Sequence, residues 1–330
     1  MTLRIVAPGL LTTVQDAGRF GWRHLGIAQC GALDPMAATL ANRLVGNAAG
    51  EAVLELSLQG PTLQLDRPVR LAICGARVLA RFDSGSGSGS GKAMTVEAGR
   101  PVELPAGVLR VGALRDGARA WLAFAGGIDV PTMLGSRSTD LRGGFGGFSG
   151  RALRAGDELA LRDPPTIACR HVRMPRWWID PDADERGMPI RYIPSQRSGD
   201  ARLDGRAWRV SSRSNRQGAR LEGSMLGGSA PELERDEEIS APVAPGTIQL
   251  PPDGQPIVLL ADAQTMGGYP RLGHVIAADL HRLAQLRPGD DVRFQPCDMQ
   301  TATRLACALR ARVARIALMI DQQITRGNLG

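Results

Sequence analysis

Short runs of leucine and β-branched residues, each closed by glycine or proline, recur along almost the whole sequence. Apolar and β-branched runs bounded by turn-forming residues are typical of β-strands. The 41 glycines and 22 prolines among 330 residues favour many turns and short strands over long helices. The sequence therefore predicts a mainly β fold with a few helices, and its strands are expected at residues 3–6, 10–14, 53–58, 62–65, 69–73, 78–82, 94–96, 102–111, 118–124, 207–210, 257–260 and 292–294.

Three helices are expected. Asp34 can cap a helix that has Pro35 in its first turn and Gly46 after its last, and its apolar residues recur every four positions. Apolar spacing also predicts a helix over residues 274–286 and a long amphipathic helix over residues 300–324.

The length of the chain indicates two domains, and a stretch rich in proline and charge at residues 162–190 is the place where the composition changes. We expect an N-terminal subdomain over residues 1–165, a boundary region over 166–205, a second subdomain over 206–299 and a C-terminal helix over 300–330. An Arg-x-Gly-x-Arg pattern occurs in each part, at Arg19 to Arg23 and at Arg216 to Arg220, which suggests two related halves.

Composition excludes several classes of protein. The net charge is +7, but the arginines alternate with acidic residues and form no block, so a nucleic-acid partner is not expected. Lys92 is the only lysine, which excludes a biotin carrier and a phosphate-binding P-loop. The four histidines and five cysteines lack metal-binding spacing, so we expect no metal. Reduced thiols, together with the lack of a signal peptide or membrane span, predict a cytoplasmic protein with no membrane partner.

The most informative polar stretch follows the apolar run at residues 257–260. It contains Asp262, Gln264, Thr265 and Tyr269 around two glycines, and polar side chains at the end of a buried strand are a common way to build a site. The alternative is a Gly-Gly-Tyr-Pro turn whose polar groups only satisfy the backbone. If the stretch is a site, Gln264 and Arg216 should lie in one cleft, and replacing either should abolish activity while leaving the melting temperature nearly unchanged.

Two further segments stand out. Residues 135–141 form either an ordered functional loop that presents Arg137, Ser138 and Asp140 or a structural loop between strands. Residues 84–91 read SGSGSGSG, which is a flexible link by composition and interrupts an expected hairpin. We assign this link no function.

Four segments, in order along the chain, together resemble the family of 5-oxoprolinase C subunits. They are LLTTVQDAGRFGWRHLGIAQCGALDPMAATLANRLVGN, LAFAGGIDVPTMLGSRSTDLRGGFGG, SNRQGARLEG and DGQPIVLLADAQTMGGYPRLGHVIAADL. The relatives of this family include KipA and the carboxyltransferase subdomain of urea carboxylase, which is related to allophanate hydrolase subunit 2. The resemblance covers residues 3–296, and the chain departs from it at SGSGSGSG and in its long C-terminal helix.

The resemblance implies a carboxyltransferase-type subdomain at residues 1–165, a cyclophilin-like subdomain at residues 206–299 and barrel character in both halves. It also implies a role as the C subunit of an ATP-dependent 5-oxoprolinase. Such a protein works with two partners, a KipI-like B subunit plus an A subunit, on 5-oxo-L-proline to give L-glutamate. Two alternatives stay open. In the first alternative, the chain is a KipA-like regulator that sequesters a kinase inhibitor. In the second, it is the carboxyltransferase subunit of a urea-carboxylase-type, biotin-dependent system. Either way, ATP would act with the partner subunits, and no biotin would be attached to this chain.

Both enzymatic chemistries need donors that stabilise an oxygen atom as it gains negative charge, and arginine and amide side chains suit this role. A carboxylate can orient an arginine or move a proton. By family position, the residues expected to be catalytic are Arg216, Arg220, Asp262 and Gln264. Those expected to bind substrate are Arg19, Arg23, His24, Arg137, Ser138, Asp140, Glu222, Thr265 and Tyr269.

Overall fold

The computed structural model describes residues 2–84, 94–162, 165–167, 169, 171–181, 187–196, 203–226 and 239–326. The chain forms two compact units. Unit 1 comprises Met1–Gly18, Asp34–Pro181 and Val313–Gly330, and unit 2 comprises Arg19–Leu33 and Asp182–Arg312. The segment Arg19–Leu33 therefore belongs to unit 2 although it lies early in the sequence. The subdomain boundaries inferred from composition stay a prediction.

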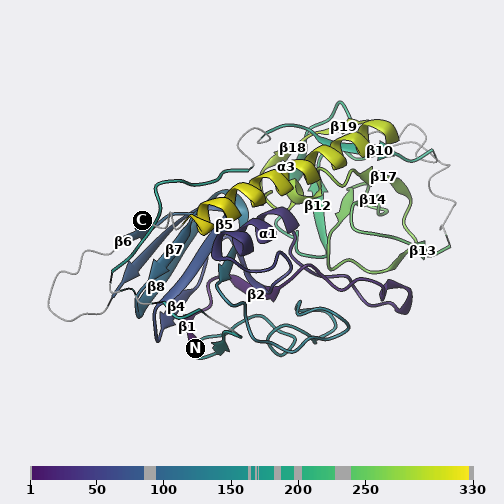
Figure 1. Ribbon diagram of the computed structural model, residues 1–330. Coiled ribbons are helices and arrows are strands. Elements are labelled where there is room, and N and C mark those ends of the chain that lie inside the picture. The colour runs from purple at the N-terminus through teal and green to yellow at the C-terminus, as the bar shows by residue number, and fades with distance from the viewer. Residues whose placement is uncertain are drawn as a thin grey trace. The chain divides into compact units, whose positions relative to one another are not determined.

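Unit 1 is built on a nine-stranded antiparallel sheet, seen on the left of Figure 1. Its main order is β2-β3-β8-β4-β1-β9, and β5 pairs with β6, β7 and β8. The long β8 pairs with β4 near its start, with β3 near its end and with β5 along most of its length. The strands are β1 (Thr2–Ala7), β2 (Leu11–Gln15), β3 (Val53–Ser57), β4 (Thr62–Leu65), β5 (Val69–Asp83), β6 (Met94–Val96), β7 (Pro101–Leu104), β8 (Gly107–Phe124) and β9 (Glu158–Ala160).

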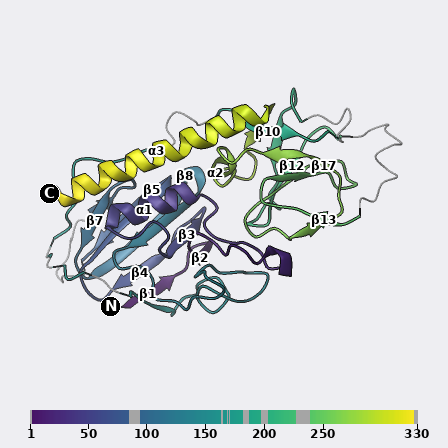
Figure 2. The same ribbon diagram turned by 45° about the vertical axis from the view of Figure 1, so that its right-hand side comes forward.

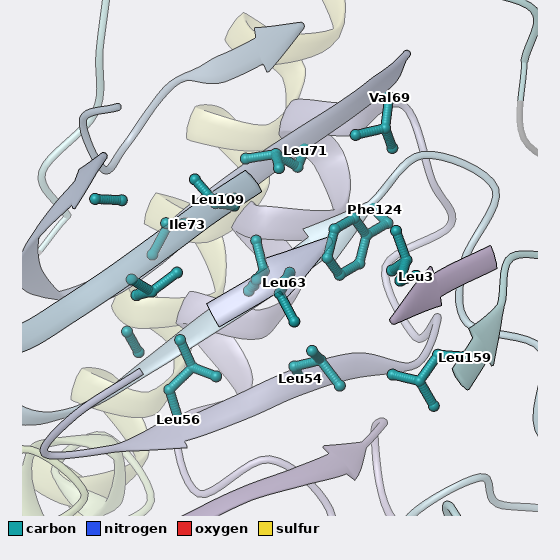
Figure 3. Packing of buried hydrophobic residues seen from close by; sticks show 14 of the residues in the cluster. Leu3, Leu54, Leu56, Leu63, Val69, Leu71, Ile73, Leu109, Phe124 and Leu159 are labelled. Carbon is teal, nitrogen blue, oxygen red and sulfur yellow. The ribbon is translucent and has the colours of Figure 1, made fainter. Parts of the chain in front are cut away.

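One large hydrophobic cluster of unit 1 lies on one face of this sheet. Leu54, Leu63, Leu109 and Phe124 come from different strands, are fully buried and belong to one cluster (Figure 3). Successive side chains of a strand point to opposite faces, so neighbours such as Trp121 lie on the other face, and Trp121 is also buried. Burial of each large apolar side chain contributes about 1.5–3 kcal/mol.

The helix α1 (Pro35–Val45) contacts β5 and β8, and it lies across the sheet in both views (Figures 1 and 2). The Asp34 carboxylate accepts a hydrogen bond from the Ala37 backbone N–H at 2.9 Å, and Gly46 ends the helix with a φ of 83°. Both the bounds and the caps of this helix confirm the prediction from sequence.

Unit 2 is a curled sheet of eight strands in the order β18-β11-β12-β15-β14-β17-β10-β19. The two end strands, β18 and β19, are separated in the chain by Arg293 alone, so the sheet curls until its two edges meet in one continuous segment. This arrangement confirms the expected barrel character. The strands are β10 (Ile190–Pro194), β11 (Trp208–Val210), β12 (Gly218–Glu222), β14 (Thr247–Gln249), β15 (Ile257–Leu259), β17 (Arg271–Val275), β18 (Asp291–Val292) and β19 (Phe294–Pro296).

Smaller elements complete the fold. A separate two-stranded sheet joins β13 (Ala241–Pro242) to β16 (Met266–Gly267), and Arg23–Leu25 forms the short 3₁₀ helix η1. The helix α2 is one turn long (Leu280–Leu283). The helix α3 (Met299–Thr325) confirms the long helix predicted at the C-terminus, and it begins in unit 2 and ends in unit 1.

The helix predicted over residues 274–286 is wrong. Residues 271–275 form strand β17, which pairs with β10 on one side and β14 on the other, and only Leu280–Leu283 is helical. Gly273 permits this close pairing, because a Cβ atom at this position would lie 2.4 Å from the Ile193 carbonyl oxygen. Apolar spacing in this segment fits both structures, and strand pairing on both sides decides between them.

The two Arg-x-Gly-x-Arg patterns both lie in unit 2. The first, from Arg19 to Arg23, lies in the Arg19–Leu33 segment and ends in η1, whereas the second ends inside strand β12 at Arg220. They are therefore not structurally equivalent positions. The hairpin expected on either side of SGSGSGSG is formed by β5 and β6, with Ala80 opposite Val96, and residues 85–91 lie outside the described residues.

Candidate functional site

Three loops of unit 2 are joined through their main chains. The Leu260 N–H donates to the Gln217 carbonyl at 2.9 Å, and the Asp262 N–H donates to the Arg216 carbonyl at 3.1 Å. From the Arg19–Leu33 segment, the Cys30 N–H donates to the Ala261 carbonyl at 3.0 Å. We call residues 260–266 the central loop. It follows β15, as the sequence indicated, and it is held on a rigid support by two other segments.

Arg216 and Asp262 form a buried ion pair within this cluster. Arg216 Nε and Nη2 each lie 2.8 Å from one Asp262 carboxylate oxygen, which is a bidentate arrangement. The Arg216 Nη2 group also donates to the Gly31 carbonyl at 2.7 Å. Both side chains are only 4% exposed. The guanidinium thus ties the segment that carries Gly31 to the central loop, which is a positioning contact.

Arg23 has a different environment. Its Nη2 group donates to the Val243 carbonyl at 2.6 Å and to the Gln264 carbonyl at 3.1 Å, both of which are neutral acceptors. Within the described part of the chain, its Nη1 group is buried without a hydrogen-bond partner and no carboxylate pairs with the guanidinium. Burial lowers the pKa of Arg23, and the nearby Cys30 partly opposes this effect. In both ribbon views the segment that contains η1 extends beside β13 (Figures 1 and 2).

Gln264 and Gln249 meet beneath β16. The Gln264 Nε2 group donates to Gln249 Oε1 at 3.4 Å. Gln249 is 2% exposed, and its Nε2 group has no partner among the residues that the structure describes. A Cβ atom at Gly267 would lie 2.5 Å from this nitrogen, so the glycine allows β16 to pack directly on the amide.

Unit 1 contains a second polar cluster, centred on Asp16. Its Oδ1 atom accepts hydrogen bonds from the hydroxyl groups of Ser136 at 2.7 Å and Ser138 at 2.6 Å, and from the Gly18 N–H at 2.8 Å. Its Oδ2 atom accepts one from the Arg137 N–H at 2.5 Å. The loop is therefore held in one conformation by a buried carboxylate.

Asp140, which follows in this loop, accepts hydrogen bonds from the backbone N–H groups of Arg142 at 3.0 Å and Gly143 at 2.8 Å. Its side chain thus stabilises a local turn. The Arg137 guanidinium is half-buried.

The residues predicted from sequence are thus divided between the two units. Unit 2 brings Arg23, Arg216, Asp262, Gln264 and the buried Thr265 into the cluster around the central loop, and Arg137, Ser138 and Asp140 lie in unit 1. Arg19 is fully buried and lies in unit 2, where its backbone N–H donates to the Gln29 carbonyl at 2.7 Å. The exposed members of the predicted set are His24, Arg220, Glu222 and Tyr269.

Two residues of these clusters were not predicted. Gln249 lies in β14, in which all three residues are buried. A polar amide in such a strand was the feature of the sequence that could have identified it. Asp16 is an acidic residue that directly follows strand β2 and lies two positions before Gly18.

The family model for the carboxyltransferase domain, subdomains A and B, matches residues 25–296 of the chain. The chain belongs to the carboxyltransferase-domain family. The family match contains the central loop, Gln249, Arg216 and the loop from Ser136 to Asp140, whereas Asp16 and Arg23 precede it.

Among the relatives of this carboxyltransferase domain is the C subunit of the 5-oxoprolinase of Escherichia coli (strain K12). It is 38% identical over 313 residues, which are 92% of this chain and 93% of the relative. The solved structure of TTHA0988 is 36% identical with a TM-score of 0.74 and covers 89% of this chain. That of the Kluyveromyces lactis urea carboxylase is 28% identical with a TM-score of 0.79 and covers 96% of this chain.

This domain accounts for 55% of the TTHA0988 chain and 29% of the urea carboxylase chain, so both solved relatives carry further sequence beyond it. Within the described ranges, no helix has both the length and the apolar character needed to cross a membrane.

Proposed function

We propose that this chain is the C subunit of an ATP-dependent 5-oxoprolinase, which works with an A and a B subunit to convert 5-oxo-L-proline to L-glutamate. The observation that carries the proposal is the similarity to the C subunit of E. coli 5-oxoprolinase along 93% of that protein. A relationship over nearly the full length of both chains supports the same place in the same kind of assembly.

The chemistry of the central loop is compatible with this reaction. Opening the lactam ring places negative charge on the lactam oxygen, and a fixed N–H donor stabilises that charge. In this proposal Gln264 is the donor. The buried pair of Arg216 and Asp262 positions the loop that carries Gln264, because the Arg216 guanidinium donates both to the Asp262 carboxylate and to the Gly31 carbonyl.

We further propose that the partner subunits supply the ATP site and complete the substrate site. The sequence has no P-loop motif, and its only lysine is Lys92. The TTHA0988 chain also extends well beyond this domain, as expected if a partner can be fused to it in some relatives. The exposed Arg220, Glu222, His24 and Tyr269 are then available to a partner or to substrate.

The test is reconstitution. The chain should co-purify with the B subunit. The complex that also holds the A subunit should hydrolyse ATP only when 5-oxo-L-proline is present and should release glutamate, whereas the chain alone should release none. Glutamate release by the isolated chain would refute the partner requirement, and an inactive reconstituted complex would refute the proposed function.

A second candidate function is carboxyl transfer from carboxybiotin to urea, supported by the similarity to the Kluyveromyces lactis urea carboxylase over 96% of this chain. Incubation with a carboxylated biotin carrier and urea separates the two functions. A chain that supports neither reaction and still binds the B subunit would instead fit a KipA-like regulator.

A further inference from the structure

We propose that Arg23 binds the carboxylate group of the substrate, and that this contact makes the enzyme specific for a lactam that carries a carboxylate. This inference rests on the proposed function and names the part of 5-oxo-L-proline that one residue recognises. It also separates recognition by Arg23 from the chemistry at the lactam, which the proposed function assigns to the neighbouring Gln264.

The first argument is charge. Arg23 is the arginine of the central-loop cluster without a carboxylate partner among the described residues, whereas Arg216 is neutralised by Asp262 at 2.8 Å. An arginine side chain stays protonated at neutral pH even when burial lowers its pKa. A half-buried cation held only by neutral carbonyl groups is therefore stabilised when an anion binds to it.

The second argument is geometry. The carbonyl oxygens of Val243 and Gln264, at 2.6 and 3.1 Å, both accept from the same terminal nitrogen, Nη2, and so fix the guanidinium plane. The other terminal nitrogen, Nη1, is buried and has no hydrogen-bond partner in the described structure, so its hydrogen atoms are left unsatisfied until an acceptor reaches them. Arginine presents its N–H groups as a rigid fork that matches carboxylate oxygens.

The third argument is the neighbourhood. Gln264 contributes a carbonyl to Arg23 through its main chain and an amide to Gln249 through its side chain, so it lies between the cation and the buried amide. The Gln249 Nε2 group is a second buried donor without a partner among the described residues. Two buried donors of the cluster, Arg23 Nη1 and Gln249 Nε2, are thus unsatisfied within the described residues, as expected for a site that takes an oxygen-rich anion.

The test uses the reconstituted complex with steady-state kinetics on two substrates, 5-oxo-L-proline and its neutral carboxamide. Arg23→Met should raise the KM for 5-oxo-L-proline by about 10- to 100-fold, as expected for the loss of a charged hydrogen bond, and change kcat by less than about 3-fold. Arg23→Lys should give a smaller increase, because lysine keeps the charge but not the fork. The wild-type complex should already use the carboxamide poorly, and neither variant should weaken its use or binding further.

Arg209→Met is the matched control, because Arg209 is also in unit 2 but its side chain is 66% exposed and pairs with the exposed Asp291. Its kinetics should equal those of the wild type. A KM within about 3-fold of wild type for Arg23→Met, or equal losses on acid and carboxamide, would overturn the proposal. Equal losses would indicate that Arg23 only holds the loop. A wild-type complex with no 5-oxoproline-dependent activity would instead refute the proposed function itself.

Discussion

Replacing Asp262 by alanine should destabilise unit 2 strongly, because it leaves the Arg216 guanidinium buried without a counter-charge. Both side chains are 4% exposed, and the pair is bidentate with two 2.8 Å contacts. Breaking such a pair costs about 3–5 kcal/mol. At about 2–4 °C per kcal/mol for a unit of this size, the melting temperature should fall by roughly 6–20 °C.

The second half of this experiment removes both charges. In Arg216→Met/Asp262→Leu, apolar side chains replace the pair and the main remaining loss is the hydrogen bond to the Gly31 carbonyl, about 1 kcal/mol. The double variant should therefore be clearly more stable than Asp262→Ala. Thermal and urea unfolding, followed by circular dichroism, measure both effects.

Two results would refute this reasoning. One is a fall of less than about 2 °C for Asp262→Ala, which would mean that the pair is hydrated in solution. The other is a double variant as unstable as the sum of the Arg216→Met and Asp262→Ala single variants, which would mean that the two charges are not coupled. The burial of Arg216 also reverses the expectation from sequence that its loss would leave the melting temperature nearly unchanged.

Three other outcomes are expected. Gln264→Ala should lower 5-oxoproline-dependent ATP hydrolysis by about 10²- to 10³-fold. The melting temperature should change little, because the substitution removes only a 3.4 Å hydrogen bond of the Gln264 side chain. Full activity of this variant in the complex would exclude Gln264 as a donor. Asp16→Ala should destabilise unit 1 by about 1–3 kcal/mol, since it leaves the Ser136 and Ser138 hydroxyl groups without their buried acceptor, and an unchanged urea midpoint would contradict this. Arg151 lowers the pKa of Asp157 through a side-chain hydrogen bond. The ionised Asp157 therefore stabilises the fold at pH values above the ordinary pKa of an aspartate, and this stabilisation is lost as the pH falls through the lowered pKa of the folded state. The free energy of unfolding of Asp157→Asn should thus be lower than that of the wild type by about 0.5–1 kcal/mol at pH 7, and the difference should shrink in acid.

Local patterns in the sequence predicted much of the fold. The Asp34 cap, the glycine after Val45 and the apolar spacing between them were enough to predict the bounds of α1 from its own sequence. The segment at residues 274–286 could not be assigned in this way, because strand pairing with β10 and β14 overrides its helical spacing. Pairing between distant strands leaves little trace in a local pattern.

The sequence predicted which residues lie in the cluster around the central loop better than it predicted the contacts between them. The polar stretch after β15 indicated Gln264 and Asp262, but the sequence has no feature that shows Arg216 neutralised by Asp262 and Arg23 bonded, among the described residues, to carbonyl groups. The environment of each arginine depends on which loops meet, and these loops lie far apart in the chain. The buried acceptor and donor groups of Asp16 and Gln249 were missed for the same reason.

The division of the chain between the two units bears on its synthesis. Unit 2 uses Arg19–Leu33, which leaves the ribosome long before its other part, Asp182–Arg312, and unit 1 uses Val313–Gly330, which leaves after all of unit 2. At about 5–20 residues per second, the early segment waits many seconds for the partners of Cys30 and Gly31. Neither unit can be completed before the residues of α3 that it contains have been made, so both units finish folding late and almost together.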